Sequence, residues 1–198
     1  LQWGSAWLEK RILRRQLGPV EDVQEQLTIT LDMAARALQE ERFQGAAMAC
    51  VTELANRLLC DRVSIGFRKG EAVEVVAISH SAQFSEQMNL VQAIGRAMDE
   101  GLDQGRSILY PPDEVHKTAI TRIHAELAAH HKSVSILTIP LAASGGVPCG
   151  ALTFERGEGP PFTPREIELC RAIGALLGPI LEEKRRNDRT LWAKLMAS

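Results

Sequence analysis

Hydrophobic side chains recur at helical spacing in some parts of the chain and at every second position in others. Residues 43–59 carry apolar side chains near one face of a predicted helix. Between Val63 and Phe67 apolar and polar residues alternate, which is typical of a strand with one buried face. The dipeptide Lys69-Gly70 suits a tight turn, and the alternation resumes over residues 73–79. This stretch therefore predicts a helix followed by a β-hairpin.

The following residues repeat this succession of helices and strands. Apolar residues at helical spacing predict helices over residues 84–103 and 118–131, with a short strand over residues 107–110 between them. A second hairpin follows, with strands over residues 134–141 and 147–155. Short strands in this order, flanked by amphipathic helices that can bury them, favour an α+β fold. We expect an antiparallel sheet of five or six strands with helices on both faces.

Long helices are predicted at both ends of the chain. Thr163 and Glu166 form a capping box around Pro164, and the helix that they start should continue through Pro179 with a kink. We expect its first part, residues 164–183, to pack beside the helix of residues 43–59 on one face of the sheet. Near the N-terminus, apolar residues at steps of three and four form a seam: Val20, Val23, Leu27, Leu31, Ala34 and Leu38.

This seam leaves two interpretations open. It can pair with the same helix of a second copy, which predicts a homodimer, or it can pack on its own domain. The organisation that follows is an N-terminal helical segment over residues 1–41, a domain over residues 42–183 and a helical linker over residues 184–198. Because the chain begins with Leu1 rather than Met, we expect it to be part of a longer protein.

Charge and cysteine usage narrow the possible functions. The formal net charge is −2, which excludes a generally basic nucleic-acid binder. The histidines lack the spacing that places two imidazoles on one helical face, so we expect no metal site. The cysteines form no C-x-x-C pair and lie in apolar stretches, which predicts buried, reduced thiols and a cytoplasmic location. They are Cys50, Cys60, Cys149 and Cys170.

Several segments in this order resemble a GAF domain. The resemblance covers about residues 42–183, and it implies a small-molecule sensor or dimerisation module whose ligand lies between the sheet and the helices of one face. The function implied is a non-catalytic regulatory domain that signals through its terminal helices, with an unknown ligand and an unknown cofactor. The segments that carry the resemblance are residues 43–59, 61–67, 75–80, 138–141, 149–154 and 162–164.

The resemblance implies a pocket between the sheet and the helices of residues 84–103 and 118–131. A structural role competes with ligand contact for several of the candidates: a strand end for His80 and Tyr110, and plain core packing for Phe84 and Met88. By position, the candidate pocket residues are His80, Phe84, Met88, Ile94, Tyr110, His116 and Thr138.

Two alternative functions stay open beside the sensor. A degenerate GAF domain would serve only as a dimerisation or adaptor module, without a ligand. One branch of the family reduces free methionine sulfoxide with pocket cysteines, so a thiol-based reductase that uses Cys60 or Cys149 is the third possibility.

A narrower resemblance concerns the protein around this domain. Residues 79–84, 97–100 and 177–182 look like a GAF subgroup that precedes a HlyD-type membrane-fusion adaptor region in bacterial secretion and efflux proteins. The basic residues from Lys184 onward and Trp192 are typical of the cytoplasmic flank of a membrane span. The resemblance therefore implies the cytoplasmic part of a membrane-associated transport adaptor, whereas charge alone equally suits a solvated helical linker.

Overall fold

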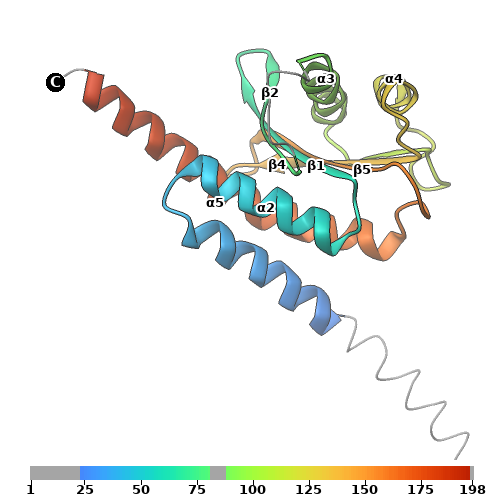
Figure 1. Ribbon diagram of the computed structural model, residues 1–198, viewed down its shortest axis with the longest axis horizontal. Coiled ribbons are helices and arrows are strands. Elements are labelled where there is room, and N and C mark those ends of the chain that lie inside the picture. Colours follow the sequence, from blue (N-terminus) through green and yellow to red (C-terminus); the bar gives the residue numbers. More distant parts are fainter. Residues whose placement is uncertain (1–22, 81–87, 197–198) are drawn as a thin grey trace, which may run out of the picture.

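The computed structural model describes residues 23–80 and 88–196 of the chain. Its centre is a five-stranded antiparallel sheet with the strand order β2-β1-β5-β4-β3, and helices lie on both of its faces (Figure 1). The predicted fold class is thereby confirmed. The strands are β1 (Arg62–Lys69), β2 (Ala72–Ile78), β3 (Ile108–Tyr110), β4 (Ser135–Ala142) and β5 (Pro148–Arg156).

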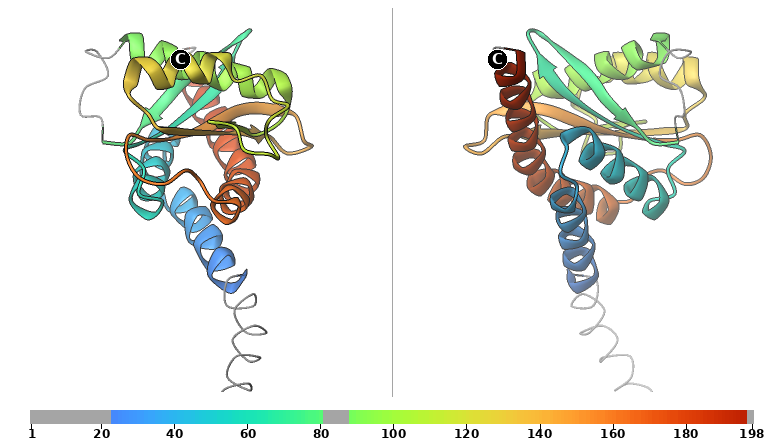
Figure 2. Two further views of the ribbon diagram at one scale, coloured as in Figure 1. Left: turned by 90° about the vertical axis from the view of Figure 1, so that its right-hand side faces the viewer. Right: turned by 60° about the vertical axis from the view of Figure 1, so that its left-hand side comes forward.

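Two helices cover one face of the sheet together. They are α2 (Phe43–Arg57) and α5 (Pro164–Met196), which lie side by side beneath the strands (Figure 2, left). The strands turn large apolar side chains toward them, among them Phe67 and Phe154, and every second residue of the central strands joins this larger core. The prediction that these two helices share one face is therefore confirmed.

A further helix, over residues 23–39, lies against α2 and α5 on the side away from the sheet (Figures 1 and 2). Met33 and Ala37 of this helix are completely buried in the larger core. The large apolar residues in the described part of the predicted seam face solvent instead, and Ala34 is half-buried, so the interpretation that the seam packs on its own domain is wrong. Val20 lies outside the described residues. The exposed fractions are 63% for Val23, 57% for Leu27, 55% for Leu31 and 62% for Leu38.

The opposite face of the sheet carries α3 (Met88–Gln104) and α4 (Arg122–His131) over a smaller apolar core. The prediction for α4 began four residues too early and placed Ile120 on its apolar face. Ile120 in fact precedes the helix and is 65% exposed. The Gln104 side chain explains this, because it donates to the Ile120 carbonyl at 2.8 Å and accepts from the Ile120 N–H at 2.8 Å, which holds that peptide outside the helix.

The long helix α5 begins as the sequence predicts. The Thr163 N–H donates to Glu166 Oε2 at 2.7 Å, and the Glu166 N–H donates to Thr163 Oγ1 at 3.3 Å, which is the reciprocal bonding of a capping box. The helix continues through Pro179 to Met196 as one element. It approaches β4 most closely at Gly178, where a Cβ atom would overlap the Ala142 carbonyl oxygen. Only glycine permits this contact between helix and strand backbone.

The C-terminal part of α5 is attached to the start of α2. Asp188 Oδ2 accepts a hydrogen bond from the Phe43 N–H at 2.9 Å, and the Lys184 ammonium donates to the Glu40 carbonyl at 2.6 Å. The basic residues that the sequence assigns to a linker therefore extend the helix of the domain itself. None of the described helices combines the length and apolarity that a bilayer crossing requires.

Candidate functional site

A row of hydroxyl side chains crosses the middle of the sheet on the α3/α4 side. Ser64 of β1 is paired with Thr153 of β5, which is paired with Thr138 of β4, and all three residues are completely buried. The two threonine hydroxyls lie 3.0 Å apart and hydrogen-bond to each other. Among the described residues, the Ser64 hydroxyl has no hydrogen-bond partner. A buried hydroxyl without a partner is costly, so this group calls for a functional explanation.

His124 of α4 joins this polar row to α3. Its Nε2 atom is 2.8 Å from Thr138 Oγ1 and its Nδ1 atom is 2.6 Å from Glu100 Oε2, and the ring is completely buried. The contact with a carboxylate places a proton on Nδ1. The ring therefore bridges the Glu100 carboxylate of α3 and the Thr138 hydroxyl of β4, and it extends the row of hydroxyls to α3.

Glu100 also caps the N-terminus of α4. Oε1 accepts from the Ile123 N–H at 3.0 Å and Oε2 from the His124 N–H at 3.2 Å, which satisfies two of the unpaired donors of a helix start. Burial by itself raises the pKa of Glu100, but these donors and the His124 ring hold that pKa below its ordinary value. The carboxylate is therefore ionised at neutral pH and fixes α4 against α3.

A cleft of about 440 Å³ opens between α3 and α4 at the outer surface of this side. Ala93, Ile123 and Leu127 form its apolar part, and Ala93 and Leu127 belong to the smaller core. Polar and charged side chains complete the lining: Asn89, Gln92, Arg96, Glu126, His130 and His131.

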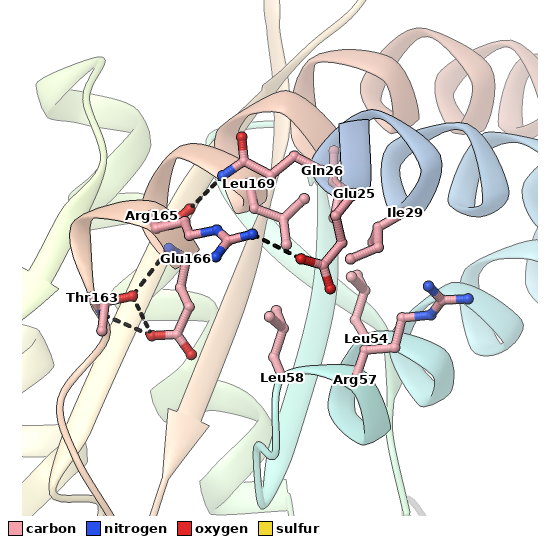
Figure 3. Close-up of a pocket in the computed structure, with 11 residues that line it drawn as sticks. Glu25, Gln26, Ile29, Leu54, Arg57, Leu58, Thr163, Arg165, Glu166 and Leu169 are labelled. Atoms are coloured by element: carbon pink, nitrogen blue, oxygen red, sulfur yellow. Dashed lines mark hydrogen bonds and ion pairs between the residues drawn. The ribbon is translucent and has the colours of Figure 1, made fainter. Parts of the chain in front are cut away.

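A second cavity, of about 340 Å³, lies on the far side of the molecule among the helix of residues 23–39, α2 and α5 (Figure 3). Its floor is aliphatic, and Ile29 and Leu169 line it from facing helices. Charged groups at its edge are paired: Arg165 contacts Glu25 at 2.8 Å, and Arg57 contacts Asp32 at 3.1 Å. These pairs attach the N-terminal helix to the domain, which is a structural role.

The cysteines are all buried, as predicted. Burial raises the pKa of Cys50 and of Cys60 to about 12 and that of Cys149 to about 11, and it also raises the pKa of Cys170. The thiols are therefore protonated at neutral pH and lack the thiolate that nucleophilic chemistry needs. Within residues 23–80 and 88–196, no three histidine, cysteine or carboxylate side chains gather in a way that could hold a metal ion.

Sequence comparison decides the family. The GAF domain family model matches residues 22–181, a range that holds the sheet, the helices on both of its faces and the helix of residues 23–39. The chain belongs to the GAF family. None of the curated protein sequences compared with it matches. The predicted HlyD-type context finds no support in these matches and stays a prediction.

Solved structures agree with this GAF fold. The GAF domain of a putative sensor histidine kinase from Pseudomonas syringae pv. tomato is 12% identical, with a TM-score of 0.57 over 92% of this chain and 99% of that one. A phycoerythrobilin-bound GAF domain from a cyanobacterial phytochrome is 16% identical, with a TM-score of 0.58 over 82% and 97%. Free methionine-R-sulfoxide reductase from Neisseria meningitidis, in complex with its substrate, is 12% identical, with a TM-score of 0.58 over 80% and 89%. At these identities the likeness extends to the fold.

The GAF domain brings together three of the predicted pocket residues. Ile94, Tyr110 and Thr138 all lie on the α3/α4 side, where Ile94 is completely buried in the smaller core and Tyr110 packs against it. His80 follows β2 and is exposed, and Met88 begins the described part of α3 and is 65% exposed, so the core role considered for Met88 is wrong. Phe84 lies outside the described residues.

His116 lies elsewhere in the GAF domain, against α5. Its Nδ1 atom is 2.6 Å from Asp113 Oδ1, and its Nε2 atom accepts from Arg171 Nη2 at 3.3 Å. Arg171 also donates to Ser107 Oγ at 3.1 Å. His116 therefore connects the β3–α4 segment to α5, and the prediction that places it near the other candidates misplaces it.

Sequence reasoning missed four residues of the polar network. Ser64 fell on the polar side of an alternating strand, and no role was assigned to Thr153, Glu100 or His124. One signal was available: helices were expected on both faces of the sheet, so polar residues at alternate positions of the central strands had to be buried as well. The hydrogen bond between Glu100 of α3 and His124 of α4 depends on tertiary contact and leaves no local pattern in the sequence.

Proposed function

We propose that this GAF domain is a non-catalytic sensor that binds a small molecule on the α3/α4 side of its sheet. The single observation that supports this best is the buried Ser64 hydroxyl, which has no hydrogen-bond partner among the described residues and continues the row of Thr153 and Thr138. A fold tolerates such a group when another molecule supplies the partner.

Mass spectrometry of small molecules released from protein purified without heating tests the proposal. We expect one compound in near-stoichiometric amount with the natural chain, and less of it with Ser64→Ala. Ser144→Ala in the β4–β5 turn is the matched control and should retain the compound. Protein that releases no compound, and binds none from a cell extract, would contradict the sensor.

We also propose that the terminal helices signal within a homodimer formed through the exposed seam. Val23 and Ala34, and likewise Leu27 and Leu38, are 11 residues apart. A repeat of this length keeps apolar residues on one side of a nearly straight helix. The four large residues of the seam are each more than half exposed, so they can contact a second copy related by a two-fold axis.

Sedimentation equilibrium at tens of micromolar tests the dimer. Leu27→Glu with Leu31→Glu places two charges in the seam and should give a monomer. Gln24→Glu with Gln39→Glu adds the same charge at exposed positions beside the seam and should leave the dimer intact. A natural chain that sediments as a monomer would contradict the proposal.

The exposed seam also favours a second candidate function, a GAF domain that acts only as a dimerisation or adaptor module. A stable dimer that holds no ligand would establish it in place of the sensor. The reductase has less support, because burial raises the pKa of Cys60 and Cys149. Reduction of methionine sulfoxide that is lost in Cys149→Ser or Cys60→Ser would establish it.

The cytoplasmic membrane-adaptor context remains our proposal for the parent protein. The basic residues along the last turns of α5, such as Arg186 and Arg189, support it, since they suit the cytoplasmic side of a membrane. Fractionation of cells that express the complete gene tests it. Recovery in the inner-membrane fraction is expected, and recovery only in the cytosol would contradict it.

A further inference from the structure

Two helix faces meet across the cleft between α3 and α4. Asn89, Gln92 and Arg96 follow one another at steps of three and four along α3, and Ile123, Glu126 and His130 do the same along α4. Residues at these steps lie on one side of a helix. The cleft is therefore lined by these two helix faces, which are polar except at Ile123, together with the apolar side chains of Ala93 and Leu127.

The charge of the cleft is set by one guanidinium. Arg96 is exposed and forms no ion pair with any other described residue, whereas most of the arginines of the domain are engaged with carboxylates. Glu126 is the one carboxylate among the lining residues, and Arg122 lies 4.0 Å from it. Its negative charge is thus shared with a cation outside the cleft, which leaves Arg96 as the uncompensated charge.

The remaining polar groups of the lining also favour a negatively charged ligand. Asn89 and Gln92 offer amide donors, and they lie near the N-terminal end of α3, where the helix dipole favours an anion. His130 and His131 lie at the opposite wall. Burial lowers the pKa of His131, and the Arg62 guanidinium and His130 lower it further while Glu155 opposes them. A neutral imidazole still donates one hydrogen bond.

We propose that this cleft binds an organic anion, a carboxylate or a phosphate monoester that carries an apolar chain. Arg96 holds the anionic head together with the amide groups, because a guanidinium presents paired donors that match carboxylate and phosphate oxygens. The chain lies on Ala93, Ile123 and Leu127. Ser64, Thr138 and Thr153 are not among the residues that line this cleft, so the inference goes beyond the proposed function and assigns a second binding site on the same side of the sheet.

Calorimetric titration of the natural chain with four probes tests the class. Octanoate and octyl phosphate carry both the charge and the chain, octanamide lacks the charge, and inorganic phosphate lacks the chain. We expect one or both of the charged chains to bind at least tenfold more tightly than octanamide and inorganic phosphate. The tighter of the two identifies the head group. Equal binding of octanamide, or no binding of either charged chain, would overturn the inference.

Three variants locate the binding. Arg96→Gln should weaken the charged probe about tenfold. Glu126→Gln should tighten it several-fold, because it removes the one carboxylate of the lining, and this opposite sign separates an electrostatic effect from damage to the fold. Arg186→Gln, at an exposed position of α5 outside the cleft, matches the charge change and should have no effect. Unchanged binding in both Arg96→Gln and Glu126→Gln would overturn the inference.

These outcomes are distinct from failure of the sensory function. A neutral compound that is released from purified protein, together with no binding of the charged probes, would keep the sensor and reject the anion. Binding of the charged probes that depends on Arg96 would keep the anion site even where purification yields no compound.

Discussion

The two faces of the sheet differ in what their side chains do. The face under α2 and α5 is filled by large apolar side chains such as Ile65, Phe67 and Phe154, which are completely buried. At the neighbouring positions of the same strands, the face under α3 and α4 carries Ser64 and Thr153. The first arrangement maximises apolar burial, whereas the second buries groups that need partners. The larger apolar core and the proposed ligand site thereby lie on opposite sides of one set of strands.

The largest effect should come from the apolar face. Phe154→Ala removes a completely buried ring that also packs edge-on against Phe162 at 6.4 Å between ring centroids. We expect the free energy of unfolding in urea to fall by about 3–5 kcal/mol, since the cavity left behind adds to the lost burial. Retention of the probe octanoate by the variant below its unfolding midpoint would show that the two faces act separately. A loss under about 1 kcal/mol would contradict the division of roles.

On the polar face the effect of a deletion depends on its partners. His124→Leu leaves the buried Glu100 carboxylate and the Thr138 hydroxyl short of a partner, and should cost about 2–3 kcal/mol. In a Glu100→Gln background His124→Leu should cost less, because it no longer leaves a buried carboxylate charge without its hydrogen-bond partner. Urea unfolding of the four proteins in this double-mutant cycle measures the coupling, and additive losses would contradict it.

Ser64→Ala should have the opposite sign. Removal of a buried hydroxyl that has no partner among the described residues relieves a desolvation cost, so we expect a gain of up to about 1 kcal/mol in protein freed of ligand. Thr153→Val, at the paired position of β5, removes a bonded hydroxyl and should destabilise by a similar amount. Thermal unfolding of the two variants checks the contrast, and a loss in Ser64→Ala would show that its hydroxyl is satisfied.

The smallest expected effect is on the stability of the protein at acid pH. The pKa of Glu100 is below that of a glutamate in an unfolded chain, so its contribution to stability is complete above about pH 4.3 and is lost as the pH falls through the folded value. Glu100→Gln should reduce the decrease in melting temperature as the pH falls below about 4.3. Glu158→Gln, in the exposed loop after β5, should leave that decrease unchanged. Glu166, at the start of α5 on the apolar side, also has a pKa below its ordinary value, because its burial, which raises the pKa, is outweighed by Arg156 and Thr163. An acid dependence that Glu100→Gln leaves unchanged would therefore be assigned to Glu166 instead.

The sequence was sufficient for the fold and insufficient for the site. The alternation in β1 and the capping box of α5 are local signals, and each was placed correctly. The start of α4 was misplaced because the Gln104 side chain, which is distant in sequence, fixes the peptide before it. The polar row depends on the register among three strands, and Glu100 meets His124 only once two helices pack. Such features are properties of tertiary contact rather than of any one segment.

At Gly178 the backbone of α5 contacts the backbone of Ala142, and this contact divides the helix into two arms. At 1.5 Å per residue, the arm from Gly178 back to Pro164 is roughly 21 Å long and the arm onward to Met196 is roughly 27 Å. If α5 tilted as one element about this contact, its two ends would move in opposite directions, and the longer arm would move about 1.3 times as far as the shorter. Because Asp188 accepts a hydrogen bond from the first N–H of α2, the start of α2 would move together with the longer arm.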